Sequence, residues 1–370
     1  MKVKPVNVAV IGIGSISDIY LSNLTDIFKD VKVIGVCSHS RQSAENAGKK
    51  YGIPNVYETM LDAFNDSNVE LILNLTRPDQ HYEVTKAALL SGKHVYSEKP
   101  IAGTLEEGKE LAQIAKEKGL MLGGAPDTFM GAGIQTCRKL IDDGFIGDVV
   151  GTAAFMICHG HESWHPNPDF YYQPGGGPMF DMGPYYLTAM INLAGGVDSV
   201  MCASKKSFEQ RVITSKPLEG NRINVNVDTY VAGTVKYKSG AIGTLFTTFD
   251  AYYPNQTRFE VYGSRGTLFV SDPNGFAGSI KLLRPEDKEI RDMPYLFDYS
   301  FNSRGLGLDD MAVAIRTGRR PRADLAQTLH VLNIMCGFEE SSKSGQWVKM
   351  TTQYERGMPM RNLPLTGRLD

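Results

Sequence analysis

The sequence has no closely spaced pair of cysteines. Its five cysteines are odd in number and scattered, and no C-x-x-C pattern occurs, so nothing points to a disulfide framework. Neither sign of charge is in excess: 39 Lys and Arg residues oppose 41 Asp and Glu residues, for a net charge of −2. This near balance gives no support to a nucleic-acid or membrane-surface partner. From the unpaired spacing of the cysteines we expect a reduced, cytoplasmic setting.

Long hydrophobic runs are also missing. The apolar segment near the N-terminus, "VNVAVIGIG", is interrupted by glycines and lacks a small-residue cleavage site. We expect neither a secretion signal nor a transmembrane span, and the segment is typical of a strand that enters a turn. With 370 residues, of which 42% are hydrophobic, the chain can bury the cores of two domains.

The sequence has two parts, which differ in their pattern of hydrophobic residues. Residues 1–124 alternate short β-branched runs, such as "VKVIGVCS" and "VELILNL", with amphipathic segments that end in glycine. This pattern predicts a doubly wound parallel sheet with crossover helices. From about residue 149 longer alternating strands follow, with a hairpin turn at Ser239–Gly240, and they predict an antiparallel or mixed sheet. We expect domains at 1–124 and 125–370, with C-terminal helices that return toward the first domain.

The first strand runs into "GIGSIS". Gly12 and Gly14 stand between a strand and a helix, where glycines let a pyrophosphate approach the helix N-terminus. Ser17 occupies the place of the third glycine in G-x-G-x-x-G. Taken alone, the two glycines also fit a plain tight turn. In this βαβ setting we expect a dinucleotide site in which Gly12, Gly14, Ser15 and Ile16 contact the cofactor.

The acid that usually ends the second strand of an NAD site is missing. Ser38 stands there, and Arg41 follows three residues later. A serine removes charge repulsion and an arginine pairs with a 2′-phosphate, so the pattern favours NADP over NAD as the cofactor. The alternative is that Arg41 is only a first-turn residue of a solvated helix.

Five segments carry a resemblance to a known family. They are "GIGSIS", "NLTRPDQH", "GKHVYSEKP", "KLIDDGFIG" and "GGGPMFDMGPYY", and in order and spacing they resemble the glucose-fructose oxidoreductase, inositol dehydrogenase and rhizopine-catabolism (Gfo/Idh/MocA) family. The resemblance implies an N-terminal Rossmann domain, a C-terminal domain with an open-faced mixed sheet, and a nicotinamide cofactor. It also implies that Lys99 reaches the reacting hydroxyl, that Glu98 contacts the nicotinamide ribose, and that Thr76 and His81 lie on the cofactor side. By itself, a lysine after a strand is more often a surface residue.

The histidine of the family pattern D-x-G-x-H-x-x-D is absent. Asp181 and Gly183 match, but Tyr185 replaces the histidine, as in the glucose-fructose oxidoreductase and dihydrodiol dehydrogenase branches. A phenol, with a pKa of about 10, serves as a base only beside a cation, so Tyr185 as acid/base requires Lys99 nearby. Asp181 would orient Tyr185, hold Lys99 or accept a substrate hydroxyl. Alternatively, Tyr185 is a packing residue and Asp181 a helix cap.

A run of histidines precedes that motif. "ICHGHESWHPNPDFYYQPGGG" includes His159, His161, Trp164 and His165, and we expect a loop that lines a sugar pocket rather than a metal site, because no ligand cluster follows at suitable spacing. The glycine triplet should provide backbone clearance beside cofactor and substrate. Asp127 is expected to contact substrate hydroxyls, whereas His330 lies in an apolar helical stripe and fits a packing role better.

The predicted function is hydride transfer between NADP or NAD and a secondary hydroxyl of a sugar, glycoside or cyclitol. Lys99, Tyr185 and Asp181 are the predicted catalytic residues, and Lys99, Asp127, His161, Trp164, His165, Asp181 and Tyr185 the predicted substrate contacts. Two alternatives remain: a glycosidase that uses tightly bound NAD for transient oxidation, and a non-catalytic nicotinamide or sugar sensor. The open sheet face is a candidate surface for a homodimer or homotetramer.

Overall fold

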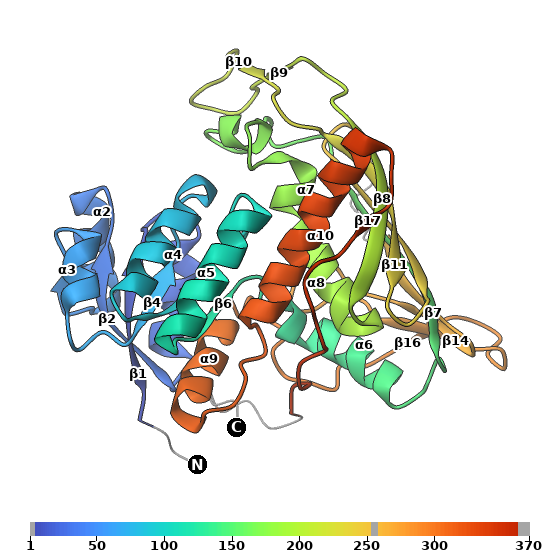
Figure 1. Cartoon of the computed structure of the whole chain (residues 1–370), viewed down its shortest axis with the longest axis horizontal. Coiled ribbons are helices and arrows are strands. Elements are labelled where there is room, and N and C mark those ends of the chain that lie inside the picture. Colours follow the sequence, from blue (N-terminus) through green and yellow to red (C-terminus); the bar gives the residue numbers. More distant parts are fainter. Residues whose placement is uncertain (1–3, 253–257, 362–370) are drawn as a thin grey trace. The chain divides into compact units, whose positions relative to one another are not determined.

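The computed structural model describes residues 4–252 and 258–361. Its contacts divide the chain into two compact units (Figure 1). Unit 1 comprises the described parts of Met1–Gln135, Leu296–Leu332 and Gly357–Asp370, and unit 2 those of Thr136–Tyr295 and Asn333–Arg356. The predicted first domain, residues 1–124, therefore lies within unit 1, which also takes in segments from the end of the chain.

Unit 1 is built on a six-stranded parallel sheet in the order β3-β2-β1-β4-β5-β6. The strands are β1 (Val6–Ile11), β2 (Val31–Cys37), β3 (Asn55–Val56), β4 (Leu71–Asn74), β5 (His94–Ser97) and β6 (Leu122–Gly124). All four residues of β4 are buried, as expected of a central strand in a sheet covered on both faces. The order reverses between β1 and β4, and ligands bind at the carboxyl ends of such strands. The predicted doubly wound sheet is confirmed.

The crossover helices of unit 1 follow local signals in the sequence. They are α1 (Ser17–Asp26), α2 (Arg41–Tyr51), α3 (Met60–Asn65), α4 (His81–Leu90) and α5 (Leu105–Lys118). Thr59 and Thr104 cap α3 and α5 in reciprocal capping boxes with Asp62 and Glu107. Helix α5 ends at Gly119, whose φ is +64°. These short-range interactions explain why the helices were predictable from the sequence.

Two late helices complete unit 1. Helix α9 (Leu306–Thr317) and the start of α10 (Leu325–Ser344) come from the end of the chain. Between them, the Ala323 carbonyl accepts a hydrogen bond of 3.2 Å from the N–H of Gly124 in β6. The outer strand of the sheet is thus covered by chain that lies some two hundred residues away in sequence.

Unit 2 contains a nine-stranded mixed sheet in the order β16-β15-β14-β13-β7-β12-β11-β8-β17. Its strands are β7 (Val149–Ile157), β8 (Val197–Lys205), β11 (Tyr230–Tyr237), β12 (Ile242–Thr248), β13 (Arg258–Gly263), β14 (Gly266–Phe269), β15 (Lys281–Leu283), β16 (Arg291–Asp292) and β17 (Val348–Lys349). Strands β7 and β12 pair in parallel and the others antiparallel. The hairpin predicted at Ser239–Gly240 joins β11 to β12, with a φ of +91° at Gly240. The predicted mixed sheet is confirmed.

One face of this sheet is covered by helices. Helix α8 (Gly183–Ala194) packs against β7, and a Cβ on Gly233 of β11 would collide with the Phe338 ring of α10. Both helices lie on the same side of the sheet in Figure 1. Leu245, on this face of β12, is fully buried, whereas Ile242, on the opposite face, is 59% exposed. The opposite face is therefore open, as predicted.

The remaining elements in the described part of the chain are α6 (Ala132–Asp142), α7 (Gly177–Asp181), β9 (Gln210–Val212), β10 (Arg222–Asn224) and the short 3-10 turns η1 (Pro78–Gln80), η2 (Thr128–Met130) and η3 (Asp169–Tyr172).

Candidate active site

The glycine loop joins β1 to α1 in unit 1. Gly12 has a φ of +99°, and a Cβ there would lie 2.6 Å from the carbonyl carbon of Leu75, just after β4. No described atom lies within 4 Å of the corresponding position on Gly14. Ser17 donates a hydrogen bond of 2.7 Å to the Gly14 carbonyl, so the serine in the third-glycine position ties the loop to the helix.

The start of α1 has the features of a phosphate site. Gly14 and Ser15 are exposed, and Ile16, the N-cap residue, makes no side-chain capping hydrogen bond. The first backbone N–H groups of a helix have no partner within the helix and favour an anion. The open position at Gly14 and the start of the helix fit the pyrophosphate of a dinucleotide, and the cofactor contacts expected of Gly12, Gly14, Ser15 and Ile16 stay predictions.

Ser38 and Arg41 follow β2. Ser38 is half-buried, and Arg41 begins α2 on the surface. The Arg41 guanidinium lies 2.8 Å from a Glu45 oxygen and 3.4 Å from a Glu58 oxygen. Such exposed pairs contribute little to stability, so a ligand phosphate can compete with them for Arg41.

His81 joins the loops that follow β4 and β5. It begins α4, and its side chain is buried. Nδ1 lies 2.7 Å from the Pro100 carbonyl oxygen and Nε2 lies 2.9 Å from that of Thr76. Burial lowers the pKa of His81, and a neutral imidazole donates to one of these two oxygens. Both ring nitrogens face backbone, so His81 positions these loops, while its predicted contact with the cofactor stays a prediction.

Thr76 and Glu98 stand at the ends of the same two strands. Asn74 Oδ1 accepts hydrogen bonds from the Thr76 N–H (3.1 Å) and hydroxyl (2.6 Å). The Glu98 carboxylate accepts one from the Tyr20 hydroxyl (2.7 Å) and one from the Lys99 N–H (3.0 Å). Burial and the Glu98 charge raise the pKa of Tyr20 well above its usual value, so Tyr20 stays a donor. The backbone on both sides of Lys99 is thus held in place, by Glu98 before it and through Pro100 after it.

Asp127 caps a helix in unit 1. Its side chain is 1% exposed, and one carboxylate oxygen accepts hydrogen bonds from the N–H groups of Gly305 (2.9 Å) and Gly307 (3.0 Å), at the start of α9. Burial raises the pKa of Asp127 from 3.8 to about 6. The structure gives Asp127 a structural role at a helix N-terminus, and its contact with substrate hydroxyls stays a prediction.

The raised pKa predicts how Asp127 affects stability. Because the folded protein holds the Asp127 proton more tightly than the unfolded chain, its contribution to stability falls as pH rises from about 4 to 6. Asp127→Asn keeps an acceptor oxygen for both N–H groups and removes this dependence. The free energy of unfolding of D127N minus that of wild type should rise by on the order of 1–3 kcal/mol between pH 4 and pH 7, as measured by urea unfolding. Asp169→Asn, at an exposed carboxylate, is the control, and equal pH dependence in wild type and D127N would contradict the prediction.

The predicted histidine loop lies in unit 2, between β7 and α7. His161 Nε2 lies 3.4 Å from Asp181 Oδ2, and the two side chains are 11% and 18% exposed. The ring centroid of His159 lies 3.6 Å from that of Tyr252, in a stacked pair. Trp164 is 60% exposed, with its ring 5.4 Å from that of His165. This loop of unit 2 thus carries imidazoles and an exposed indole face, and the carboxylate beside His161 comes from the end of α7.

Asp181 and Tyr185 do not lie on one continuous helix. Helix α7 ends at Asp181 and α8 begins at Gly183, with Met182 between them. Tyr185 lies in the first turn of α8 and is 8% exposed. The break means that the spacing of four residues does not by itself place the two side chains on one face.

The glycine triplet serves the fold of the loop itself. A Cβ on Gly176 would lie 2.6 Å from the Phe170 carbonyl oxygen and 2.7 Å from that of Tyr171. Gly177 has a φ of +77°, a conformation that side chains disfavour. The clearance that the triplet provides is therefore needed by the protein's own backbone, and its predicted proximity to a cofactor stays a prediction.

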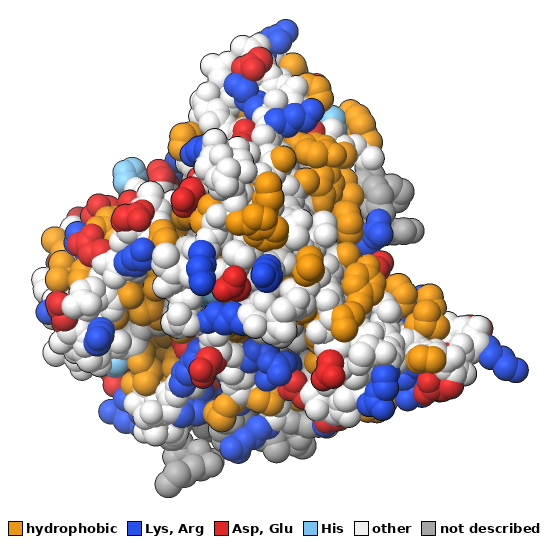
Figure 2. Space-filling view, turned by 45° about the vertical axis from the view of Figure 1, so that its right-hand side comes forward, with side chains coloured by type: hydrophobic (Ala, Val, Ile, Leu, Met, Phe, Trp, Pro, Cys, Tyr) orange, Lys and Arg blue, Asp and Glu red, His pale blue; other side chains and the backbone are white. Residues whose placement is uncertain are grey.

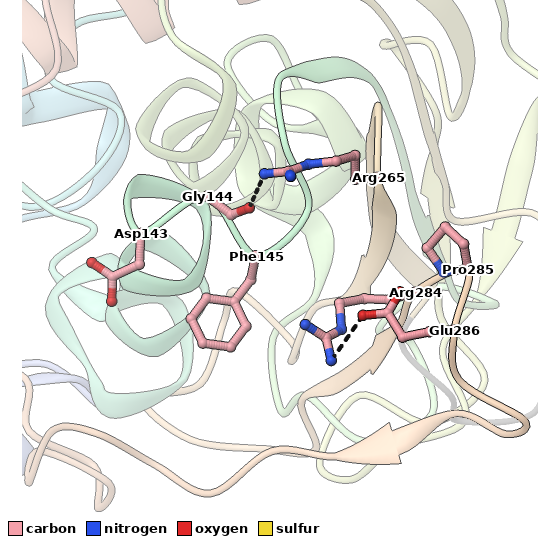
Figure 3. Close-up of a pocket in the computed structure, with 7 residues that line it drawn as sticks. All are labelled: Asp143, Gly144, Phe145, Arg265, Arg284, Pro285 and Glu286. Atoms are coloured by element: carbon pink, nitrogen blue, oxygen red, sulfur yellow. Dashed lines mark hydrogen bonds and ion pairs between the residues drawn. The ribbon is translucent and has the colours of Figure 1, made fainter.

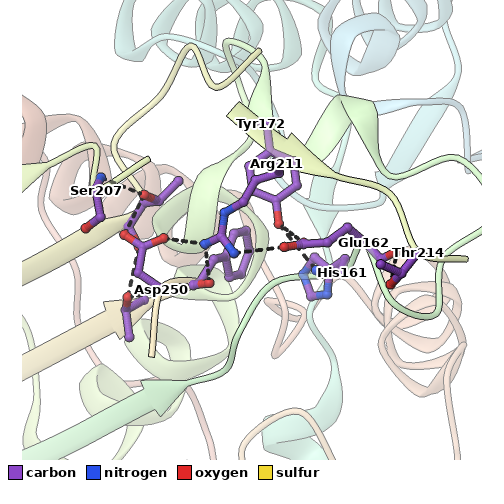
Figure 4. A network of polar contacts seen from close by, with 10 residues as sticks. His161, Glu162, Tyr172, Ser207, Arg211, Thr214 and Asp250 are labelled. Carbon is purple, nitrogen blue, oxygen red and sulfur yellow. Dashed lines mark hydrogen bonds and ion pairs between the residues drawn. The ribbon is translucent and has the colours of Figure 1, made fainter. Parts of the chain in front are cut away.

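A buried ion network anchors this loop (Figure 4). Arg211, in β9, donates to Glu162 (2.8 Å), to Asp250 (2.5 Å) and to the Phe249 carbonyl (2.7 Å). The Tyr172 hydroxyl donates to the other Glu162 oxygen. Glu162, Arg211 and Asp250 are far apart in sequence, so no spacing signal could have identified this network.

Other features lie outside the predicted site. A surface cavity of about 350 Å³ in unit 2 is lined by Asp143, Gly144, Phe145, Arg265, Arg284, Pro285 and Glu286 (Figure 3). Within the described part of the chain, no cluster of three or more His, Cys, Asp or Glu side chains is arranged to hold a metal ion. No described helix is both long enough and apolar enough to cross a membrane.

Among curated proteins, three relatives illustrate the similarity. An uncharacterized oxidoreductase of Schizosaccharomyces pombe is 27% identical over 60% of this chain and 64% of its own length. D-glucoside 3-dehydrogenase of Escherichia coli is 28% identical over 67% of this chain and 72% of its own length. The scyllo-inositol 2-dehydrogenase (NADP(+)) of Bacillus subtilis is 24% identical over 94% of this chain and 97% of its own length.

A solved structure and two family models extend the comparison. The structure of a levoglucosan dehydrogenase in complex with NADH and L-sorbose has a TM-score of 0.80 and 20% identity, over 94% of this chain and 99% of that one, which shows a shared fold. The model of the oxidoreductase family with an NAD-binding Rossmann fold matches residues 6–124. The model of the GFO/IDH/MocA C-terminal domain matches residues 134–269. The chain therefore belongs to the GFO/IDH/MocA family of oxidoreductases.

Proposed function

We propose that the protein is an NAD(P)-dependent dehydrogenase that transfers hydride between nicotinamide and a secondary hydroxyl of a sugar, glycoside or cyclitol. The observation that carries the proposal is the fixed backbone of Lys99 at the carboxyl end of β5, bonded to Glu98. Carboxyl ends of parallel strands meet at one edge of a sheet, so Lys99 and the glycine loop after β1 share that edge. A lysine that follows a strand at this edge supports the proposal, because its ammonium would be within reach of a nicotinamide bound there.

Lys99, Tyr185 and Asp181 are the proposed proton-transfer residues. When bound, the nicotinamide accepts or supplies the hydride. Removal of the hydroxyl proton requires a base, and the charge that develops on oxygen requires a nearby cation. Tyr185 would exchange the proton, Lys99 would supply the cation, and Asp181 would support them. This role of Tyr185 depends on Lys99 lying close to it, because only a nearby cation lowers the pKa of a phenol enough for it to act as a base.

The residues proposed to hold the cofactor belong to unit 1. The glycine loop and the start of α1 fit the pyrophosphate, and Glu98 and Thr76 stand at the ends of β5 and β4. We propose that NADP is favoured over NAD. Ser38 adds no negative charge after β2, and the exposed pairs of Arg41 with Glu45 and Glu58 are weak enough for a 2′-phosphate to displace. The B. subtilis relative is named for NADP(+) and the levoglucosan dehydrogenase structure contains NADH, so relatives use both cofactors.

The proposed substrate class rests on the relatives and on the histidine loop. Their names include a glucoside, an inositol and levoglucosan. Trp164 offers an exposed aromatic face, and His161 and His165 offer ring nitrogens, which suits a ring that presents both C–H and hydroxyl groups. The scattered cysteines favour a cytoplasmic location for the reaction.

We further propose that the open sheet face of unit 2 forms a homodimer or homotetramer. Met201 is 38% exposed and Ile242 is 59% exposed on this face. Figure 2, which turns the right-hand side of Figure 1 forward, shows hydrophobic side chains gathered on that side of the surface. An open apolar sheet face of this kind is typical of a self-association surface.

A substrate panel tests the proposed function. Purified protein should reduce NADP+ or NAD+ in the presence of at least one sugar, glycoside or cyclitol, with higher kcat/KM for NADP+, followed by nicotinamide absorbance. Arg41→Ala should remove that cofactor preference without abolishing turnover. Glycoside cleavage with no net change in the cofactor would instead identify a glycosidase. Ligand binding without any turnover would identify a sensing protein.

A further inference from the structure

Asp181 faces an imidazole, although the family motif lacks its histidine. The carboxylate that ends α7 lies 3.4 Å from Nε2 of His161, which comes from the loop twenty residues earlier. Both side chains are mostly buried but still reach the surface. In the sequence Tyr185 occupies the position of the motif histidine, and His161 is predicted only as a substrate contact. In the structure, the imidazole beside Asp181 comes from the loop that precedes α7 and not from the motif position that Tyr185 occupies.

The ring of His161 is held in one orientation by aromatic neighbours. Its centroid lies 4.1 Å from that of Tyr171, 4.6 Å from that of Phe249 and 5.3 Å from that of Trp164. A carboxylate beside Nε2 favours the tautomer with the proton on Nε2, because the carboxylate only accepts hydrogen bonds. Nδ1 is then the nitrogen that can accept a proton.

The backbone of His161 is also anchored. The next residue, Glu162, is locked by Arg211 and Tyr172 in the buried network of Figure 4. The N–H of His161 donates to the Tyr172 hydroxyl at 3.4 Å. Because Arg211 also bonds Asp250, just after β12, the loop is tied to the sheet of unit 2. The Glu162 carboxylate is turned to Arg211 and Tyr172, which leaves Asp181 as the acid that faces the imidazole.

Two other titratable groups near Asp181 are neutral at physiological pH. Burial raises the pKa of the Cys158 thiol to about 11, so it remains protonated. Burial lowers the pKa of His165, so its imidazole is uncharged. Neither group supplies a full charge that would compete with His161 for the Asp181 carboxylate.

We propose that His161 is a catalytic acid/base residue and that Asp181 acts through it, as an orienting carboxylate. In the oxidation direction the substrate O–H bond breaks and its proton ends on Nδ1 of His161. The C–H bond breaks with its electron pair, and a bound NAD(P)+ would accept the hydride. The Asp181 carboxylate, 3.4 Å from Nε2, would orient the ring and balance the charge of the imidazolium. This inference rests on the proposed dehydrogenase function, and within that function it makes His161, in place of Tyr185, the group that takes the substrate proton.

The first test uses the protein without cofactor or substrate. Long-range ¹H–¹⁵N spectra of histidine-labelled protein should show His161 with its proton on Nε2. Asp181→Ala should convert His161 to a mixture of tautomers, whereas Asp169→Ala, at an exposed acid in η3, should leave the spectrum unchanged. A wild-type His161 protonated on Nδ1, or no change in D181A, would overturn the inference. This readout does not depend on turnover, so it stands apart from a failure of the proposed function.

The second test uses any substrate that the panel identifies. His161→Gln should lower kcat by about 100-fold or more with little change in KM, as expected for the loss of a general base. His161→Gly should regain part of this activity when imidazole is added. If wild type turns over the substrate and H161Q keeps kcat within about twofold, the inference fails while the proposed function stands.

Discussion

Replacing Lys99 with methionine is expected to lower kcat by about a thousandfold or more, because the reacting oxygen loses its cation and any phenolate at Tyr185 loses its partner. Methionine preserves much of the length and apolar stem of the lysine side chain. The loop should survive, since the Glu98 carboxylate accepts from the backbone N–H of residue 99 and His81 contacts the Pro100 carbonyl. The measurement is steady-state turnover together with NAD(P)H binding by fluorescence.

Two controls sharpen the Lys99 experiment. Lys99→Arg keeps the positive charge but moves it and spreads it over a planar group, so it should restore only part of the activity. Lys116→Ala removes an exposed lysine from the last turn of α5 and should change nothing. Turnover by K99M within tenfold of wild type would show that Lys99 is a surface residue, as the sequence alone allowed.

Gly12→Ala is expected to destabilise the protein by about 2–4 kcal/mol before any cofactor is added, because the new Cβ combines backbone strain with a collision. The φ of +99° is unfavourable for alanine, and the methyl group would lie 2.6 Å from the carbonyl carbon of Leu75. That neighbour is backbone of the loop after β4, so it cannot rotate away. Urea unfolding of the cofactor-free protein measures the loss.

Gly14→Ala is the matched control for this loop. No described atom lies within 4 Å of the added Cβ, so stability without cofactor should stay within about 0.5 kcal/mol of wild type. Affinity for NAD(P)H should nevertheless fall, because the pyrophosphate approaches the backbone at this glycine. Equal stability loss in G12A and G14A would show that the loop is not held as described, and unchanged affinity in G14A would argue against a pyrophosphate there.

Much of unit 1 was predictable because its determinants are local. Hydrophobic runs predict strands, and the capping boxes of Thr59 and Thr104 and the terminal Gly119 delimit helices within a few residues of chain. The glycine loop was predictable for the same reason, since Gly12 and Gly14 act through their own backbone conformation and the space around them. The hairpin at Ser239–Gly240, in unit 2, was predictable in the same way, because its turn is also set by neighbouring residues.

The sequence by itself determined the family, the two sheets and the placement of Lys99 after a strand, because periodicity, caps and turns are short-range properties. Tertiary structure alone decided what three predicted site residues contact: His81 links two backbone carbonyls, Asp127 caps α9, and His161 faces Asp181. It also formed the Glu162–Arg211 pair. These contacts join residues whose separation along the chain carries no spacing signal, and burial, not local pattern, makes each polar group find its partner.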